Sequence, residues 1–138
     1  MKVDKLHIRS RFKNLENVTI EFDEHNLMTV LVGRNGSGKS NVLEALVAIF
    51  RNLDLGESPL FSYLITYRLG QRDSDRWQEV LIDADPSRGS LAKQYEVKIR
   101  DLSRKEATGT AVSDNEWIVL PFSKVKRDKE GNANFLPK

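Results

Sequence analysis

The sequence predicts a mixed α+β (α/β) fold, in which strands surround a glycine-rich loop and a single long helix. A short apolar run at 27–32 comes just before the glycines, and apolar residues with helical spacing follow them at 42–50. Farther along, between 60 and 122, runs rich in β-branched and aromatic residues alternate with turn residues. That pattern is typical of an antiparallel β-meander, so we expect the meander to follow the helix.

Composition limits the kind of protein this can be. At 138 residues the chain is long enough for one domain with its own core. A net charge of +2 gives no global argument for binding nucleic acid or a membrane. The absence of cysteine excludes disulfides, thiolate metal sites and cysteine nucleophiles. No apolar run reaches 18 residues and the first ten lack a signal-like segment, so we expect a cytoplasmic protein that does not contact membranes.

Three strands are expected before the glycines. Residues 3–8 alternate loosely, and 17–22 alternate cleanly between apolar and polar side chains. His7, on the first of these strands, is expected on the sheet surface rather than at a metal. A short basic connection, 10–14, joins the two strands. The third run, 27–32, is apolar on both faces and is therefore expected to be a central strand.

Residues 33–40, GRNGSGKS, fit the P-loop pattern G-x-x-x-x-G-K-[ST] at every required position. The pattern predicts a cradle of backbone amides for phosphate at the start of a helix, formed by Gly33, Arg34, Asn35, Gly36, Ser37 and Gly38. Lys39 would contact the β- and γ-phosphates of ATP, and Ser40 would ligate Mg²⁺. The alternative is a glycine-rich turn before an ordinary helix, but a chance match to four fixed positions is rare. The flanking strand and helix make it rarer still.

The remaining chain is expected to be mainly β-structure. The helix should end in the polar stretch 51–58, at Gly56 and before Pro59. Strands are predicted at 60–69, 77–83 and 94–102, and the short apolar stretch 117–122 is broken by Pro121. The charged segment 123–133 is expected to be a loop.

Two further patterns have a functional and a structural interpretation. Residues 79–85, EVLIDAD, could be a Walker B strand whose acid, Asp83, helps to hold Mg²⁺. An apolar strand that ends in a polar turn has the same appearance, and this is the interpretation we favour. A basic run could contact a phosphate backbone, although acidic neighbours favour a solvated loop; its members are Lys124, Lys126, Arg127 and Lys129.

The first part of the chain contains four segments in the order L-x-I, F-K-N-L, V-T-I-E-F and LMTVLVGRNGSGKSNVLEAL. In this order, the segments resemble the start of ABC-type ATPases of the SMC/RecF/RecN/OLD group. Asn35, Ser37, Asn41 and the segment 43–45 extend the likeness beyond the bare P-loop, and the agreement covers roughly 3–50. The resemblance implies an N-terminal lobe of a P-loop NTPase head, with a β-subdomain next to the P-loop helix. It also implies that a basic residue in the first connection, Lys13 or Arg11, reaches the nucleotide; a solvated cation is the alternative.

That resemblance implies ATP and Mg²⁺ as ligands and a parent protein that acts in DNA repair, DNA processing or phage defence. No glutamine loop, signature segment, Walker B Asp-Glu or switch histidine is recognisable. We therefore expect 1–138 to be a single partial ATP-binding domain, divided into 1–50, 60–122 and a charged tail, 123–138. Hydrolysis would then need the remainder of the head or a second copy, and DNA could be contacted through the parent.

Two other functions are compatible with the sequence. The first is a nucleotide-dependent switch that binds partners and does not hydrolyse ATP. The second is a small P-loop kinase or transferase, which is disfavoured because β-structure replaces the expected βα repeats.

Overall fold

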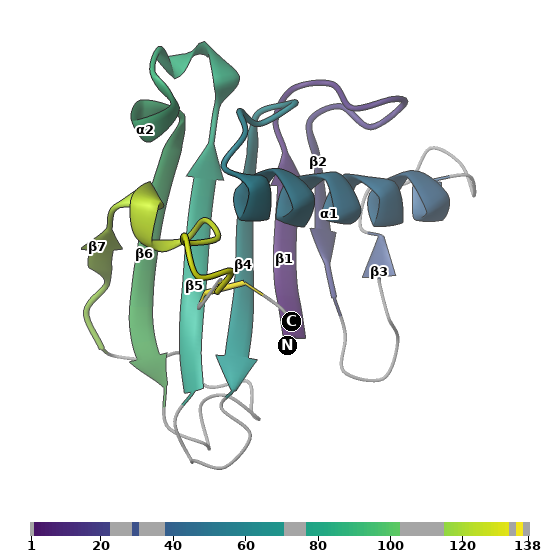
Figure 1. Ribbon diagram of the computed structural model, residues 1–138. Helices are drawn as coiled ribbons and strands as arrows, with labels where there is room; N and C mark the ends of the chain where they lie inside the picture. Colours follow the sequence, from purple (N-terminus) through teal and green to yellow (C-terminus); the bar gives the residue numbers. More distant parts are fainter. Residues whose placement is uncertain are drawn as a thin grey trace.

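A computed structural model describes residues 2–22, 29–30, 38–70, 77–102, 115–132 and 135–136. Within these ranges seven strands form one sheet in the order β3-β2-β1-β4-β5-β6-β7, with antiparallel neighbours throughout (Figure 1). The elements in chain order are β1 (Lys2–Ile8), β2 (Val18–Glu21), β3 (Thr29–Val30), α1 (Gly38–Leu55), β4 (Tyr63–Gly70), β5 (Trp77–Ala84), η1 (Pro86–Arg88), α2 (Leu91–Gln94), β6 (Tyr95–Leu102), β7 (Ile118–Leu120) and η2 (Phe122–Lys124).

The mixed α+β prediction is confirmed, and each predicted strand is present within three residues of its expected start. Strands β4 to β7 are neighbours in chain order, so the antiparallel meander predicted between 60 and 122 is also confirmed. The division of the chain into three domain segments stays a prediction. Among the described residues, no helix is both long enough and apolar enough to cross a membrane.

The strand before the glycines is not where the sequence placed it. It was expected in the centre of the sheet, whereas β3 lies at one end of the strand order and pairs only with β2 among the described residues. The expectation was based on its two apolar faces, and apolar faces report burial rather than a position in the sheet. The part of the chain that the structure describes supplies no strand for the other edge of β3.

Helix α1 crosses one face of the sheet and forms the core with it (Figure 1). Its inward side carries Val42, Ala45, Ile49 and Leu53, whose spacing of three and four residues places them on one face; all are at most 2% exposed. The facing strands contribute every second residue, as the two-residue period of a strand requires. These are Leu6, Ile8, Ile20, Tyr63, Ile65, Tyr67, Val80, Ile82, Ala84, Tyr95 and Val97.

The end of α1 follows its sequence signal. Gly56 has φ 71°, a conformation that suits glycine, and the N–H of Glu57 donates to the carbonyl of Asn52 at 2.9 Å. This arrangement is the Schellman motif that terminates many helices. The chain then turns back toward β4, so the predicted stop at Gly56 is confirmed.

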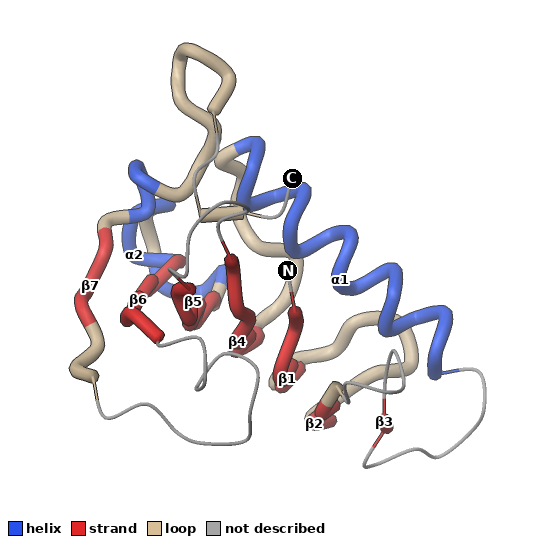
Figure 2. The backbone as a smooth tube through the Cα atoms, turned by 90° about the horizontal axis from the view of Figure 1, so that it is seen from below, coloured by secondary structure: helices blue, strands red, loops and turns tan. Residues whose placement is uncertain are grey.

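The charged segment after β7 is more than the solvated loop that was expected. Phe122, Val125 and Leu136 are buried, and the hydroxyl of Tyr67 on β4 donates to the carbonyl of Phe135 at 2.6 Å. The segment therefore returns across the sheet on the side that carries α1, as Figures 1 and 2 both show. Its apolar residues are too widely spaced to stand out among the charges, which is why the sequence pattern missed them.

The opposite face of the sheet carries charged and polar side chains that pair with one another. Arg100 on β6 donates to Glu79 on β5 through Nε at 2.8 Å, and its guanidinium lies 4.1 Å from the ring centroid of Trp117. His7 also lies on this face, between the buried Leu6 and Ile8, and bonds to Asn17 at 3.3 Å. The prediction that His7 is a surface residue of the sheet is therefore confirmed.

Candidate nucleotide-binding site

The last three residues of the P-loop coincide with the start of α1. Gly38, Lys39 and Ser40 form its first turn, and Gly33, Arg34, Asn35, Gly36 and Ser37 lie outside the described residues. The first backbone N–H groups of a helix have no partner within the helix, and its N-terminus carries a partial positive charge. No acidic residue occurs in this first turn. A helix that begins inside the motif therefore offers free backbone N–H groups of the kind that bind phosphate.

The connection between β1 and β2 is docked on the first turns of α1. Asn41, directly after Ser40, donates its side-chain amide to the side chain of Asn14. One turn farther along, the carboxylate of Glu44 is paired with the ammonium of Lys13. These two contacts bring Lys13, the candidate cation of the first connection, next to the P-loop helix; that it reaches a nucleotide stays a prediction.

Lys13 lies at the tip of a tight turn. Phe12 and Leu15 exchange two backbone hydrogen bonds of 2.8 Å, so that Lys13 and Asn14 alone form the loop between them. Lys13 has φ 53°, which is uncommon for a residue with a side chain. Arg11, the alternative candidate, donates through Nε to the carbonyl of Lys13 at 2.9 Å. Arg11 thus braces the turn, and Lys13 is the residue of the two whose charge contacts α1.

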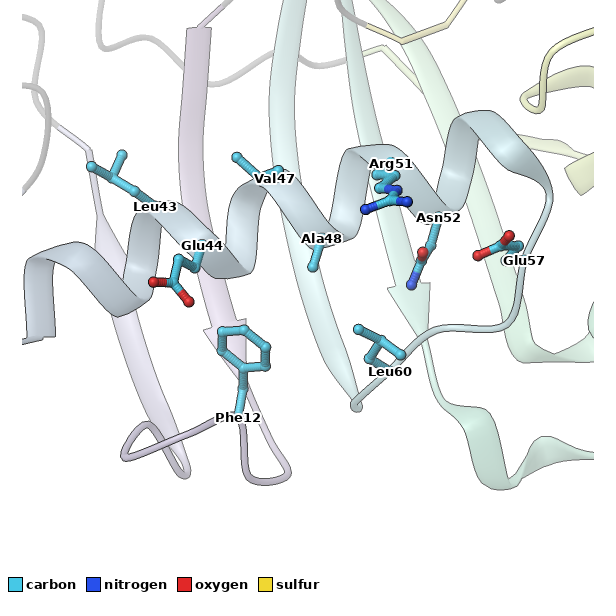
Figure 3. Close-up of a pocket in the computed structure, with 9 residues that line it drawn as sticks. All are labelled: Phe12, Leu43, Glu44, Val47, Ala48, Arg51, Asn52, Glu57 and Leu60. Atoms are coloured by element: carbon cyan, nitrogen blue, oxygen red, sulfur yellow. The ribbon is translucent and has the colours of Figure 1, made fainter.

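Beside this connection, a groove of about 620 Å³ follows the flank of α1 (Figure 3). Its apolar side chains come from α1, from the β1–β2 connection and from the segment before β4. They are Phe12, Leu43, Val47, Ala48 and Leu60, and Leu43, Val47 and Leu60 are 54%, 67% and 67% exposed. Glu44, Arg51, Asn52 and Glu57 supply its polar groups. The P-loop helix therefore has one face packed in the core and another apolar face open.

Asp83, the Walker B candidate, has a different role in the structure. Its carboxylate accepts hydrogen bonds from Arg9 at 2.5 Å and from Arg88 at 2.8 Å. Burial raises the pKa of Asp83, but these two guanidiniums outweigh it and hold the pKa below its usual value. Three strands separate β5 from β3, which is roughly 19 Å at the usual strand spacing. The Walker B interpretation of 79–85 is therefore wrong, and the favoured alternative, a strand that ends in a turn, is correct. Asp85 caps η1 through the N–H of Ser87 at 2.9 Å.

One residue of the basic run, Arg127, has a structural role. Arg127 binds the carboxylate of Asp54 near the end of α1 with two hydrogen bonds, of 3.0 and 2.8 Å. Lys124, Lys126 and Lys129 are exposed to solvent. A segment packed on the core, with three solvated lysines and one anchoring arginine, accounts for this run better than a phosphate-binding surface.

Sequence reasoning missed Asn14 and the pairing of Glu44 with Lys13. Asn14 and Asn41 are 27 positions apart, and Lys13 and Glu44 are 31 apart. No local spacing marks contacts of this kind. The one available signal was the basic connection itself, which the resemblance to known ATPases placed near the nucleotide.

Comparison with known proteins identifies the class. A family model described as an AAA ATPase domain matches residues 1–134, and the chain belongs to this family. Membership implies the P-loop NTPase fold and nucleotide binding, and proteins of the family generally use ATP and Mg²⁺. Comparisons with curated proteins and with solved structures find no match.

Proposed function

We propose that this chain is the N-terminal, Mg-ATP-binding part of an ATPase head of the SMC/RecF/RecN/OLD group. The observation that carries this proposal is the start of α1 within the P-loop motif, with the connection that bears Lys13 docked on its first turns. In the bound state, Lys39 would contact the β- and γ-phosphates and Ser40 would ligate the metal. Bound Mg²⁺ would neutralise phosphate charge; the amides of residues 33–40 and Asn41 would orient the triphosphate.

Calorimetric titration with Mg-ATP tests nucleotide binding directly. Lys39→Ala should abolish the binding heat, because it removes the ammonium that would contact the phosphates. Lys124→Ala removes an exposed ammonium of η2 and serves as the matched control, with unchanged affinity expected. Equal affinities for the two variants would refute the site.

We further propose that hydrolysis needs the remainder of the head, which would cover two incomplete surfaces. One is the edge of β3 that no described strand covers; the sequence of this strand is apolar on both faces. The other is the open face of α1, where Leu43 and Val47 are more than half exposed. An apolar groove on a P-loop helix is a surface that a soluble protein normally covers.

Mixing experiments separate this proposal from a switch module that binds ATP without hydrolysing it. ATP turnover would be measured for this chain alone and together with any downstream half from the same reading frame. Turnover only in the mixture supports the ATPase head, and binding without turnover in both supports the switch. The resemblance further suggests a parent that acts in DNA repair, DNA processing or phage defence as a head-to-head dimer, and composition suggests that it is cytoplasmic. Stimulation of the mixture's turnover by duplex DNA would test that setting.

A further inference from the structure

The contact between Lys13 and Glu44 has a feature that nucleotide binding alone does not require. Glu44 is the first acidic residue of α1, six residues after Gly38, and its carboxylate is already paired with the ammonium assigned to the nucleotide. Both side chains are about half exposed, at 48% and 52%. Exposed ion pairs of this kind contribute little to stability, so a more highly charged anion can displace the carboxylate.

The backbone around Lys13 is held in place independently of this pair. The two bonds between Phe12 and Leu15 close the turn, and Asn14 is tied to Asn41. An exchange of partners therefore needs only a rotation of the flexible Lys13 side chain. Along α1, Glu44 is four residues beyond Ser40, a displacement of about 6 Å at the rise of an α-helix.

Lys13 also adopts an unfavourable backbone conformation, with φ 53° at a position where glycine or asparagine would be easier. Strain of this kind occurs at functional positions, where the surrounding structure maintains it. Here the turn directs a charged side chain to a carboxylate on the P-loop helix.

We propose that Glu44 competes with the triphosphate for Lys13 and so sets the affinity for nucleotide. This inference rests on the proposed function, since it assumes that Mg-ATP binds at the start of α1. Without nucleotide, Lys13 is paired with Glu44. When the phosphates occupy the loop, Lys13 leaves the carboxylate for the more highly charged anion, and Glu44 becomes solvated. Glu44 is thus a positioning residue that acts through Lys13.

A double-mutant cycle tests the exchange with Mg-ATP affinities from calorimetry. Glu44→Gln should raise the affinity about two- to five-fold, because Lys13 no longer has to leave a carboxylate. Lys13→Met should lower it. In the Lys13→Met background, Glu44→Gln should have little effect, because the cation over which the two anions compete is gone.

Glu96→Gln is the matched control. Glu96 is also an exposed carboxylate paired with a lysine, Lys98 at 3.4 Å, but it lies on β6. This variant should leave the affinity unchanged. An equal gain from Glu44→Gln in both backgrounds would mean simple charge repulsion and would overturn the exchange, as would no gain in either. If the unaltered chain fails to bind Mg-ATP, the proposed function fails, and the inference fails with it.

Discussion

The guanidinium of Arg9, just past the end of β1, lies 2.5 Å from the carboxylate of Asp83 on β5, across the intervening strand β4. The same guanidinium donates to the carbonyls of Tyr63 and Ala84, at 3.0 and 2.9 Å. Arg9 thus ties together the ends of three neighbouring strands. Asp83, the residue that could have been a metal ligand in the sequence, is instead the carboxylate that Arg9 contacts at these strand ends.

Asp83→Asn should therefore lower stability and leave nucleotide binding intact. The side chain of Asp83 is 24% exposed, and the substitution removes the charge that both guanidiniums contact. We expect a loss of about 1–2 kcal/mol in the free energy of unfolding, measured by urea denaturation. Asp85→Asn is the control, because asparagine can also cap η1 and the unfolding midpoint should not change. Loss of Mg-ATP binding in Asp83→Asn would restore the Walker B interpretation.

The interaction of Asp83 with its two arginines should also make the stability of the protein depend on pH. The pKa of Asp83 is lowered in the folded protein, so the unfolded chain takes up this proton first as the pH falls. The contribution of Asp83 is therefore present above the unfolded pKa, about 3.9, and is lost as the pH falls through the folded value. As the pH is lowered from 6 to 3, the midpoint of thermal unfolding should fall less steeply for Asp83→Asn than for the parent. Parallel curves would show that Asp83 titrates alike in both states.

Substitutions at two valines of α1 should affect stability differently, because one valine is on its packed face and the other on its open face. Val42 is 0% exposed and Val47 is 67% exposed. Val42→Ala should cost about 2 kcal/mol of unfolding free energy, because it leaves a cavity in the core. Val47→Ala should stay within about 0.5 kcal/mol, as surface substitutions do. If the groove holds the remainder of the head, Val47→Lys should weaken that association without destabilising this chain. Equal losses for both alanine variants would mean that Val47 is also packed.

Tyr67→Phe tests whether the segment after β7 is anchored to the sheet. The substitution removes the hydrogen bond to the carbonyl of Phe135 and leaves the ring in the core. We expect a loss of about 1 kcal/mol and faster amide hydrogen exchange in residues 121–136. Tyr95→Phe is the matched control, since it removes a 2.7 Å bond to the carbonyl of Glu57 instead. Amide exchange should then become faster near Glu57 and not in residues 121–136. The same exchange pattern in both variants would show that the Tyr67 hydrogen bond does not anchor the segment after β7.

Because Lys13 has a strained backbone, one substitution there should raise the stability of the protein while it weakens nucleotide binding. Lys13→Gly relieves the positive φ and should raise the unfolding free energy by up to about 1 kcal/mol. Lys13→Ala keeps the strained backbone and should not raise it. Both variants lack the ammonium, so both should bind Mg-ATP more weakly than the parent. A Lys13→Gly variant with full affinity would show that the side chain has no role at the nucleotide.

Local patterns were sufficient for the long helix and the strands, but they did not predict the short helical elements η1, α2 and η2. The apolar residues spaced along 42–50 predicted a helix, and Gly56 predicted its end. Alternation predicted the strands, because burial of one sheet face requires a period of two residues. The motif at 33–40 predicted the chemistry of the site from residue types alone, although its first five residues lie outside the described chain.

The sequence by itself determined where helix and strands form and which loop has the chemistry to bind phosphate, because these depend on neighbours a few positions apart. Only the tertiary structure decided that β3 lies at an edge, that Asp83 is held by two arginines, and that Lys13 is paired with Glu44. These features join residues up to 74 positions apart, so they depend on the order in which strands pair in the sheet.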